Sequence, residues 1–191
     1  MKLLFDKDLA VNYTSKSQAI RVMSESWVIN NLFCPCCGKN SLTHLKNNTP
    51  VSDFECNNCG EFFELKSKGK AIGRKINDGA YKTMINRITS NTNSNLIVLE
   101  YNNLEVINVE LIPKYFFTPE IIEKGKSLGL NAKRAGWIGC NIVYGNIPHQ
   151  GRITIIKDGT YKDNNDIILE YTSTKKLQIE SIIKRGWLFD V

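Results

Sequence analysis

The chain has 191 residues, 42% of them hydrophobic, which is enough to bury a core and suits one domain over residues 1–191 better than two. Its formal net charge of +6 favours a polyanionic partner through counterion release. No run of 18 apolar residues is available to span a bilayer, and the apolar N-terminal stretch is too short for a secretory signal. We therefore expect a cytoplasmic protein with reduced thiols, no membrane association and no obligate protein partner.

An amphipathic helix is the first element expected, over about residues 16–31. Ser15 and Gln18 have the spacing of a capping box at its start. Apolar residues then recur at helical spacing: Ile20, Met23 and Trp27. Glu25 lies on the same helix and is a candidate for an additional acidic ligand, although solvated glutamates on helices are commonplace.

Four cysteines follow this helix as two C-x-x-C pairs separated by 18 residues: Cys34 and Cys37, then Cys56 and Cys59. Reduced thiols at this spacing are typical of a tetrahedral structural zinc site rather than of a disulfide or a redox centre. We expect these four thiolates to hold Zn²⁺ in an element embedded at about residues 33–60. Cys36 or His44 could replace one of the four ligands.

The residues on either side of the second cysteine pair are predicted to form two antiparallel strands: 51–56 and 61–67. If Cys56 lies opposite Glu61, then Asp53 lies opposite Glu64. Cross-strand neighbours on one face are about 4.5–5.5 Å apart at Cβ, and Lys66 shares that face because side chains alternate along a strand. The three charged side chains are therefore predicted to converge.

An aspartate followed by Glu-x-Lys is how metal-dependent nucleases arrange their catalytic groups. Asp53 and Glu64, with the Leu65 carbonyl as a third ligand, are predicted to hold Mg²⁺, which accepts one or two carboxylates and keeps waters for the reaction. Lys66 would stabilise negative charge on the phosphate or, at a depressed pKa, help to deprotonate water. The alternative is a charged surface hairpin in a non-catalytic zinc-ribbon module that binds DNA or a protein.

Beyond a basic loop, the second half of the chain predicts a helix and then mainly strands. The helix begins at about Asp78 and carries an apolar stripe: Tyr81, Met84, Ile85 and Ile88. Strands are predicted at residues 95–101, 104–111, 152–157 and 167–171, and a short helix at about residues 177–184. The order of these elements predicts a mixed α/β fold.

Several segments resemble the DpnI, or Dam-replacing, family of methyl-directed type II restriction endonucleases. Ser52-Asp53 with Glu64-Leu65-Lys66 resembles the motif of the PD-(D/E)xK nuclease superfamily, with serine in place of the usual proline. The family resemblance runs through most of the chain and is carried by these further segments: Trp27–Val28, Cys34–Gly38, Asp53–Cys59, Phe63–Lys68, Ile76–Tyr81 and Arg134–Asn141.

The resemblance implies a PD-(D/E)xK restriction-endonuclease-like α/β core, with a central mixed sheet flanked by helices and an embedded zinc-binding element of four cysteines. It also implies Mg²⁺-dependent cleavage of double-stranded DNA, in this family typically at GATC sites that carry N6-methyladenine. The family pattern continues into a C-terminal winged-helix domain, whereas this sequence stops about where the nuclease domain would end. We therefore expect the nuclease domain to supply recognition by itself.

Two basic segments are candidate DNA contacts: Lys133, Arg134 and Trp137, and separately Lys68, Lys70, Arg74 and Lys75. In the first, the cations can reach phosphate or guanine and the ring can meet an N6-methyl group in the major groove. In the second, the cations follow the active-site strand and can reach phosphates. Trp137 could equally be a core residue, and a run of charge is often only a solvated face.

Overall fold

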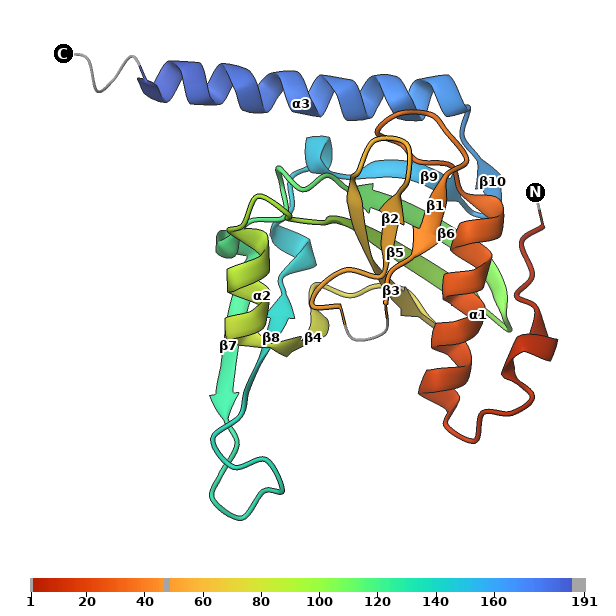
Figure 1. Cartoon of the computed structure of the whole chain (residues 1–191), viewed down its shortest axis with the longest axis vertical. Coiled ribbons are helices and arrows are strands. Elements are labelled where there is room, and N and C mark those ends of the chain that lie inside the picture. The colour runs from red at the N-terminus through yellow and green to blue at the C-terminus, as the bar shows by residue number, and fades with distance from the viewer. Residues whose placement is uncertain (1, 47–48, 187–191) are drawn as a thin grey trace.

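A computed structural model describes residues 2–46 and 49–186, and side chains up to residue 177. Seven strands form a central mixed sheet in the order β1-β2-β3-β5-β6-β9-β10 (Figure 1). Their bounds are β1 Leu42–His44, β2 Phe54–Cys56, β3 Phe62–Lys68, β5 Asn95–Asn102, β6 Glu105–Ile112, β9 Ile153–Lys157 and β10 Thr160–Tyr161. In this sheet β3 and β5 run parallel, and the other neighbours are antiparallel. The predicted mixed α/β class is confirmed.

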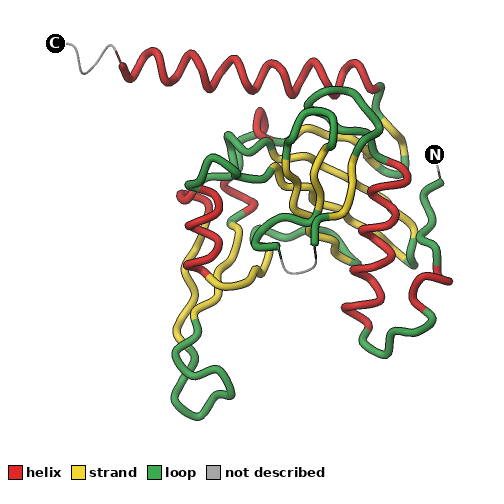
Figure 2. The backbone as a smooth tube through the Cα atoms, viewed as in Figure 1, coloured by secondary structure: helices red, strands yellow, loops and turns green. Residues whose placement is uncertain are grey.

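A second, antiparallel sheet has the order β4-β8-β7, with bounds β4 Ile76–Ala80, β7 Ile122–Ser127 and β8 Ile138–Ile142. The helix expected from about Asp78 begins later, because residues 76–80 pair with β8 and only then does α2 (Tyr81–Ile88) start. Strands β7 and β8 extend away from the body and carry a loop, residues 128–137, at their far end (Figures 1 and 2). We call β7, this loop and β8 the arm.

The longest helices are α1 (Lys16–Asn31) and α3 (Asn164–Gly186), and short 3-10 turns lie at Lys7–Ala10, Pro119–Ile121, Tyr144–Asn146 and His149–Gly151. Helix α1 has the predicted bounds, but Ser15 makes no side-chain capping bond, so the capping box is absent. Within the described part of the chain, no helix is both long and apolar enough to cross a bilayer.

The strand predicted at residues 167–171 is wrong, because these residues lie in α3. Ile167, Tyr171 and Thr174 are buried at a spacing of four and three residues, which is the period of a helix. A short run of apolar residues cannot by itself distinguish this pattern from a buried strand. The helix expected at about residues 177–184 is the later part of the same α3.

Both faces of the central sheet are covered, so β5 is buried on two sides. On one face, Ile97 and Leu99 pack in a cluster with Trp27 and Val28 of α1. On the other face, Leu96 and Val98 pack with Met84 of α2 and with residues of the second sheet. Strand β3, next to β5, therefore lies between α1 and the second sheet, and its side chains can face a site built from both.

Candidate active site and metal centre

The β2–β3 hairpin is closed at its turn by the second cysteine pair, which faces the first pair. Both pairs sit in matching turns, because the amide groups of Gly38 and Gly60 donate to the carbonyls of Cys34 and Cys56, each at 2.8 Å. Gly38 and Gly60 have φ values of +74° and +69°, a conformation that favours glycine. The two C-x-x-C-G segments thus form the same local structure.

The four thiols converge, with all Sγ atoms within 4.8 Å of one another. The Sγ atoms of Cys34 and Cys59 are 3.7 Å apart, and those of Cys37 and Cys56 are 3.6 Å apart. A tetrahedral ion with Zn–S bonds of about 2.3 Å requires sulfur–sulfur separations of about 3.8 Å, whereas a disulfide requires about 2.0 Å. The cluster could therefore hold zinc, and the two residues that could have replaced a ligand, Cys36 and His44, lie outside it.

The other end of the same hairpin has the register that the sequence predicts. Phe54 pairs with Phe63 and Glu55 with Phe62, so Asp53, one residue before β2, continues the pairing toward Glu64. The Asp53 amide donates to the Phe63 carbonyl at 2.8 Å. Its Oδ2 accepts from the Leu65 amide at 2.7 Å, which fixes the carboxylate beside β3.

Lys66 bridges two carboxylates at this end of the hairpin. Its Nζ is 2.6 Å from Glu64 Oε1 and 2.8 Å from Asp78 Oδ1. Asp78 Oδ1 also accepts from the Gly79 amide at 2.6 Å. The second oxygens, Glu64 Oε2 and Asp78 Oδ2, are buried without a hydrogen-bonding partner among the described residues. Buried carboxylate oxygens of this kind cost stability unless a cation or water satisfies them, so the residues fit a bound cation.

Burial raises the pKa of Glu64 to about 7, against the opposing effect of the Lys66 ammonium. Burial alone would lower the pKa of Lys66, but the Glu64 and Asp78 carboxylates outweigh it, so the pKa of Lys66 is raised. Lys66 is therefore a stable ammonium in this arrangement. This favours charge stabilisation, of the two roles that the sequence suggested, over proton abstraction.

Asp78 is the neighbour that sequence reasoning missed. The sequence predicts the start of a helix at this residue, which would direct the side chain elsewhere. In the structure the segment is an edge strand paired with β8, with Asp78 opposite Cys140. The one available signal was that residues 76–81 belong to a segment carrying the family resemblance.

A family model described as "DpnI: Dam-replacing family" matches residues 1–180 of the chain. The chain belongs to the Dam-replacing family. The resemblance found in the sequence is thereby confirmed, and membership implies a methyl-directed restriction endonuclease whose partner is DNA. Family membership does not by itself assign the catalytic residues or the metal ion.

In this Dam-replacing family member, the three predicted catalytic residues line one cleft with a volume of about 1110 Å³. Residues of β3 line it between α1 on one side and β4 on the other, and Asp53 reaches it from the start of β2. Glu64 and Asp78 also border a smaller cavity of about 190 Å³. The carboxylates therefore adjoin space that a hydrated ion could enter.

The predicted DNA contacts after β3 separate in the structure. Lys68 lines the cleft, whereas Lys70 and Arg74 are exposed and are not among the lining residues. Lys75, the next cation, does line it and pairs with Glu123 of the arm at 2.6 Å. The wall of the cleft is thus tied to the arm by an ion pair.

The other predicted contacts lie at the end of the arm, outside the cleft lining. Lys133 and Arg134 are exposed, and the Arg134 guanidinium lies 4.6 Å from the ring centre of Trp137. Trp137 is half-buried and stands over Gly139, where an added Cβ would come within 2.7 Å of the indole. The glycine therefore makes room for the ring, and Trp137 does not belong to either buried core.

Ser52 stands where the superfamily motif usually has proline, and its hydroxyl is part of a buried chain of hydrogen bonds. Arg87 Nη2 donates to Ser52 Oγ at 2.7 Å, Ser52 bonds Ser94, and Ser94 Oγ donates to the Val51 carbonyl at 2.8 Å. Val51 has a φ of +52°, an unusual value for a β-branched residue. The hydroxyl chain holds this strained backbone next to Asp53.

Proposed function

We propose that this chain is a Mg²⁺-dependent endonuclease that hydrolyses phosphodiester bonds of double-stranded DNA. Asp53 and Glu64, with the Leu65 carbonyl, would hold Mg²⁺, and Lys66 would act beside it. The chain is taken as one PD-(D/E)xK-type nuclease domain over residues 1–191, with the zinc element at about 33–60 as its structural part. The observation that carries the proposal is that Asp53, Glu64 and Lys66 line one cleft at the open end of the β2–β3 hairpin, with Asp53 held by the Leu65 amide and Glu64 paired with Lys66.

The contacts of each side chain suggest its role in the proposed reaction. Asp53 is fixed by the Leu65 amide, and Glu64 keeps one oxygen free of protein partners among the described residues, so both can face one ion. When bound there, Mg²⁺ would supply a polarised water and neutralise charge on the phosphate. The Lys66 ammonium, held in place by Asp78, would stabilise the charge that develops on the phosphate oxygens. Asp78 is a positioning residue in this scheme.

For the substrate, we propose GATC-like sites that carry N6-methyladenine. Family membership supports the methyl-directed activity, and the arm supplies chemistry for reading it. Arg134, which lies over the Trp137 ring, places a cation and an aromatic side chain together at the end of the arm. Such a pair can contact guanine or phosphate and cover a methyl group in the major groove.

Matched plasmids, adenine-methylated and unmethylated, test the proposal when digested with and without Mg²⁺. We expect cleavage of the methylated plasmid in the presence of Mg²⁺ only, with ends that map to GATC. Asp53→Ala should abolish cleavage while zinc content and DNA binding persist. If Asp53→Ala still cuts, the site is wrong. Wild-type protein that binds DNA and never cuts would instead favour the non-catalytic zinc-ribbon alternative.

A further inference from the structure

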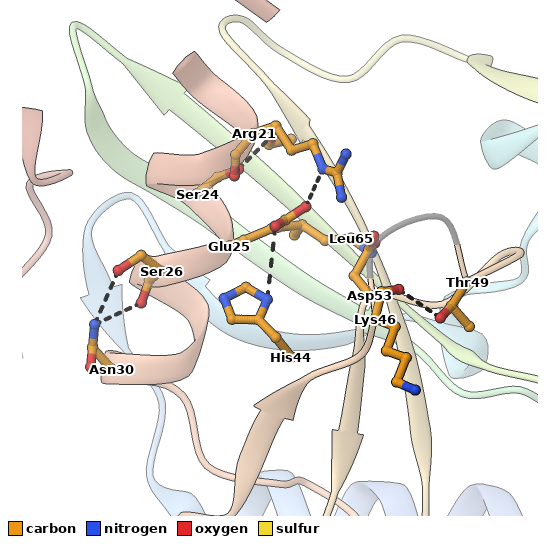
Figure 3. A network of polar contacts seen from close by, with 11 residues as sticks. Arg21, Ser24, Glu25, Ser26, Asn30, His44, Lys46, Thr49, Asp53 and Leu65 are labelled. Atoms are coloured by element: carbon orange, nitrogen blue, oxygen red, sulfur yellow. Dashed lines mark hydrogen bonds and ion pairs between the residues drawn. The ribbon is translucent and has the colours of Figure 1, made fainter. Parts of the chain in front are cut away.

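Arg21 of α1 is held at one nitrogen and free at two others. Its Nε donates to Glu25 Oε1 at 2.6 Å. Among the described residues, neither terminal Nη group has a hydrogen-bonding partner, and the side chain is 51% exposed. Figure 3 shows the guanidinium tethered to Glu25 with its two terminal nitrogens unengaged. This leaves the part of arginine that forms paired hydrogen bonds available to a ligand.

The carboxylate that holds Arg21 is itself fixed. Glu25 is 9% exposed, and its second oxygen lies 3.8 Å from His44 Nδ1 of β1 (Figure 3). A buried carboxylate with a guanidinium on one oxygen and an imidazole near the other has little freedom to move. Arg21 therefore has a defined position, unlike an ordinary surface arginine, which loses more side-chain entropy when it binds.

Helix α1 is in turn fastened to the active-site strand. Ser24 is fully buried, and its Oγ contacts Ser67 Oγ at 3.2 Å and the Arg21 carbonyl at 3.1 Å. Ser67 follows Lys66 directly, so the turn of α1 that carries Arg21 is set against β3 beside the proposed catalytic residues. Both Arg21 and Glu25 line the cleft that contains Asp53 and Lys66.

We propose that Arg21 binds a backbone phosphate of the DNA strand that enters the cleft, with Glu25 as the residue that positions it. A planar guanidinium matches two phosphate oxygens, and Arg21 occupies the wall opposite β4, where Asp78 holds Lys66. The strand would then lie between two cations, Arg21 of α1 and Lys66 of β3. The hydrogen bond and the charge of Glu25 are the main reasons that the pKa of Arg21 is raised, and the Asp53 charge makes a smaller contribution, which agrees with this placement. This inference rests on the proposed nuclease function.

Binding to a short GATC duplex without Mg²⁺, measured over a range of salt concentrations, tests the inference apart from cleavage. Arg21→Gln should weaken binding about 10-fold or more and reduce the salt dependence by about one phosphate contact. Lys16→Gln is the matched control, because Lys16 is an exposed cation of the same helix and cleft wall for which the described residues offer no carboxylate partner. We expect its effect to stay within about 3-fold, because an untethered charge in solvent is screened by salt.

Two further sets of variants test separate parts of the inference. One distinguishes the paired hydrogen bonds of the guanidinium from its charge, and the other distinguishes the positioning role of Glu25 from a role in folding. Arg21→Lys keeps the positive charge but cannot form two parallel hydrogen bonds to a phosphate, so its affinity should lie between those of Arg21→Gln and the wild-type protein. Glu25→Gln keeps an acceptor for Nε and should bind better than Glu25→Ala, with thermal unfolding measured to show that both variants fold. A duplex with methylphosphonates replacing single phosphates should show one position at which Arg21→Gln no longer matters.

Equal affinity and equal salt dependence for Arg21→Gln and Lys16→Gln would overturn the inference, as would the absence of any such phosphate position. Wild-type protein that binds the duplex and shows the Arg21 effect, yet never cuts with Mg²⁺, would leave the phosphate contact standing and remove the nuclease proposal. If the wild-type protein cuts with Mg²⁺ but Arg21→Gln binds as well as Lys16→Gln, the nuclease proposal stands and the phosphate contact of Arg21 is wrong.

Discussion

The β2–β3 hairpin has two contrasting ends. At its turn, four thiols close around one point, and two of their separations match those of a tetrahedral ion. At its open end, carboxylates and a lysine face a cleft, and two carboxylate oxygens keep no protein partner among the described residues. Structural metal sites are closed by protein ligands, whereas working sites keep positions open. The same hairpin thus joins a cluster that could hold zinc with the proposed catalytic site.

The largest effect is expected from breaking the closed end. Cys56→Ser removes one of the four thiols that could hold zinc. A structural zinc contributes on the order of 10 kcal/mol to folding, which is comparable to the whole stability of a domain. We expect loss of bound zinc, of cooperative thermal unfolding and of cleavage together. Metal analysis and calorimetry measure the first two.

Cys36→Ser is the control for that experiment, because Cys36 lies beside the cluster but is not part of it. It should keep one zinc per chain and the unfolding temperature of the wild-type protein. Loss of zinc in Cys36→Ser would show that the four-thiol assignment is incorrect.

The open end should respond in the opposite way. Glu64→Gln removes a buried charge with one unpartnered oxygen among the described residues, so it should cost about 10³-fold or more in cleavage while leaving the unfolding temperature in Mg²⁺-free buffer unchanged or higher. Residues built for activity commonly trade stability in this way. Calorimetry and single-turnover cleavage check the two halves, and a variant as unstable as Cys56→Ser would contradict the distinction between the ends.

Asp78→Asn should have an intermediate effect, about 10- to 100-fold on cleavage, as is typical when a supporting contact to an active-site group is lost. Without the second carboxylate, Lys66 pairs with Glu64 alone and competes with Mg²⁺ for it. The Mg²⁺ concentration for half-maximal cleavage should therefore rise while DNA binding without Mg²⁺ stays constant. Asp158→Asn, at an exposed turn outside the cleft lining, is the matched control.

The two ends also differ in how far sequence could predict them. The four-cysteine cluster and the pairing of β2 with β3 depend on spacing within one short segment, and both are observed. Asp78 and Arg21 come from elements that only tertiary packing brings to the cleft. The helical apolar stripe that follows suggests that the helix already begins at about Asp78. The pairing of residues 76–80 with β8 is a long-range contact that no local pattern indicates. Likewise, the strand predicted at residues 167–171 lies in α3, because a short apolar run is compatible with the period of either a strand or a helix.

Trp137 should show the smallest effect, because a methyl group covered by an apolar surface is worth about 0.8 kcal/mol, or about 4-fold. Trp137→Ala should lower the preference for methylated over unmethylated duplex by about 4- to 16-fold, the upper figure allowing for one methyl on each strand. Leu130→Ala is the control, since Leu130 is 94% exposed on the same loop. It removes apolar surface without removing the ring, so the preference should persist. Equal loss of binding to both duplexes in Trp137→Ala would mean that the ring supports the arm rather than reading the methyl group.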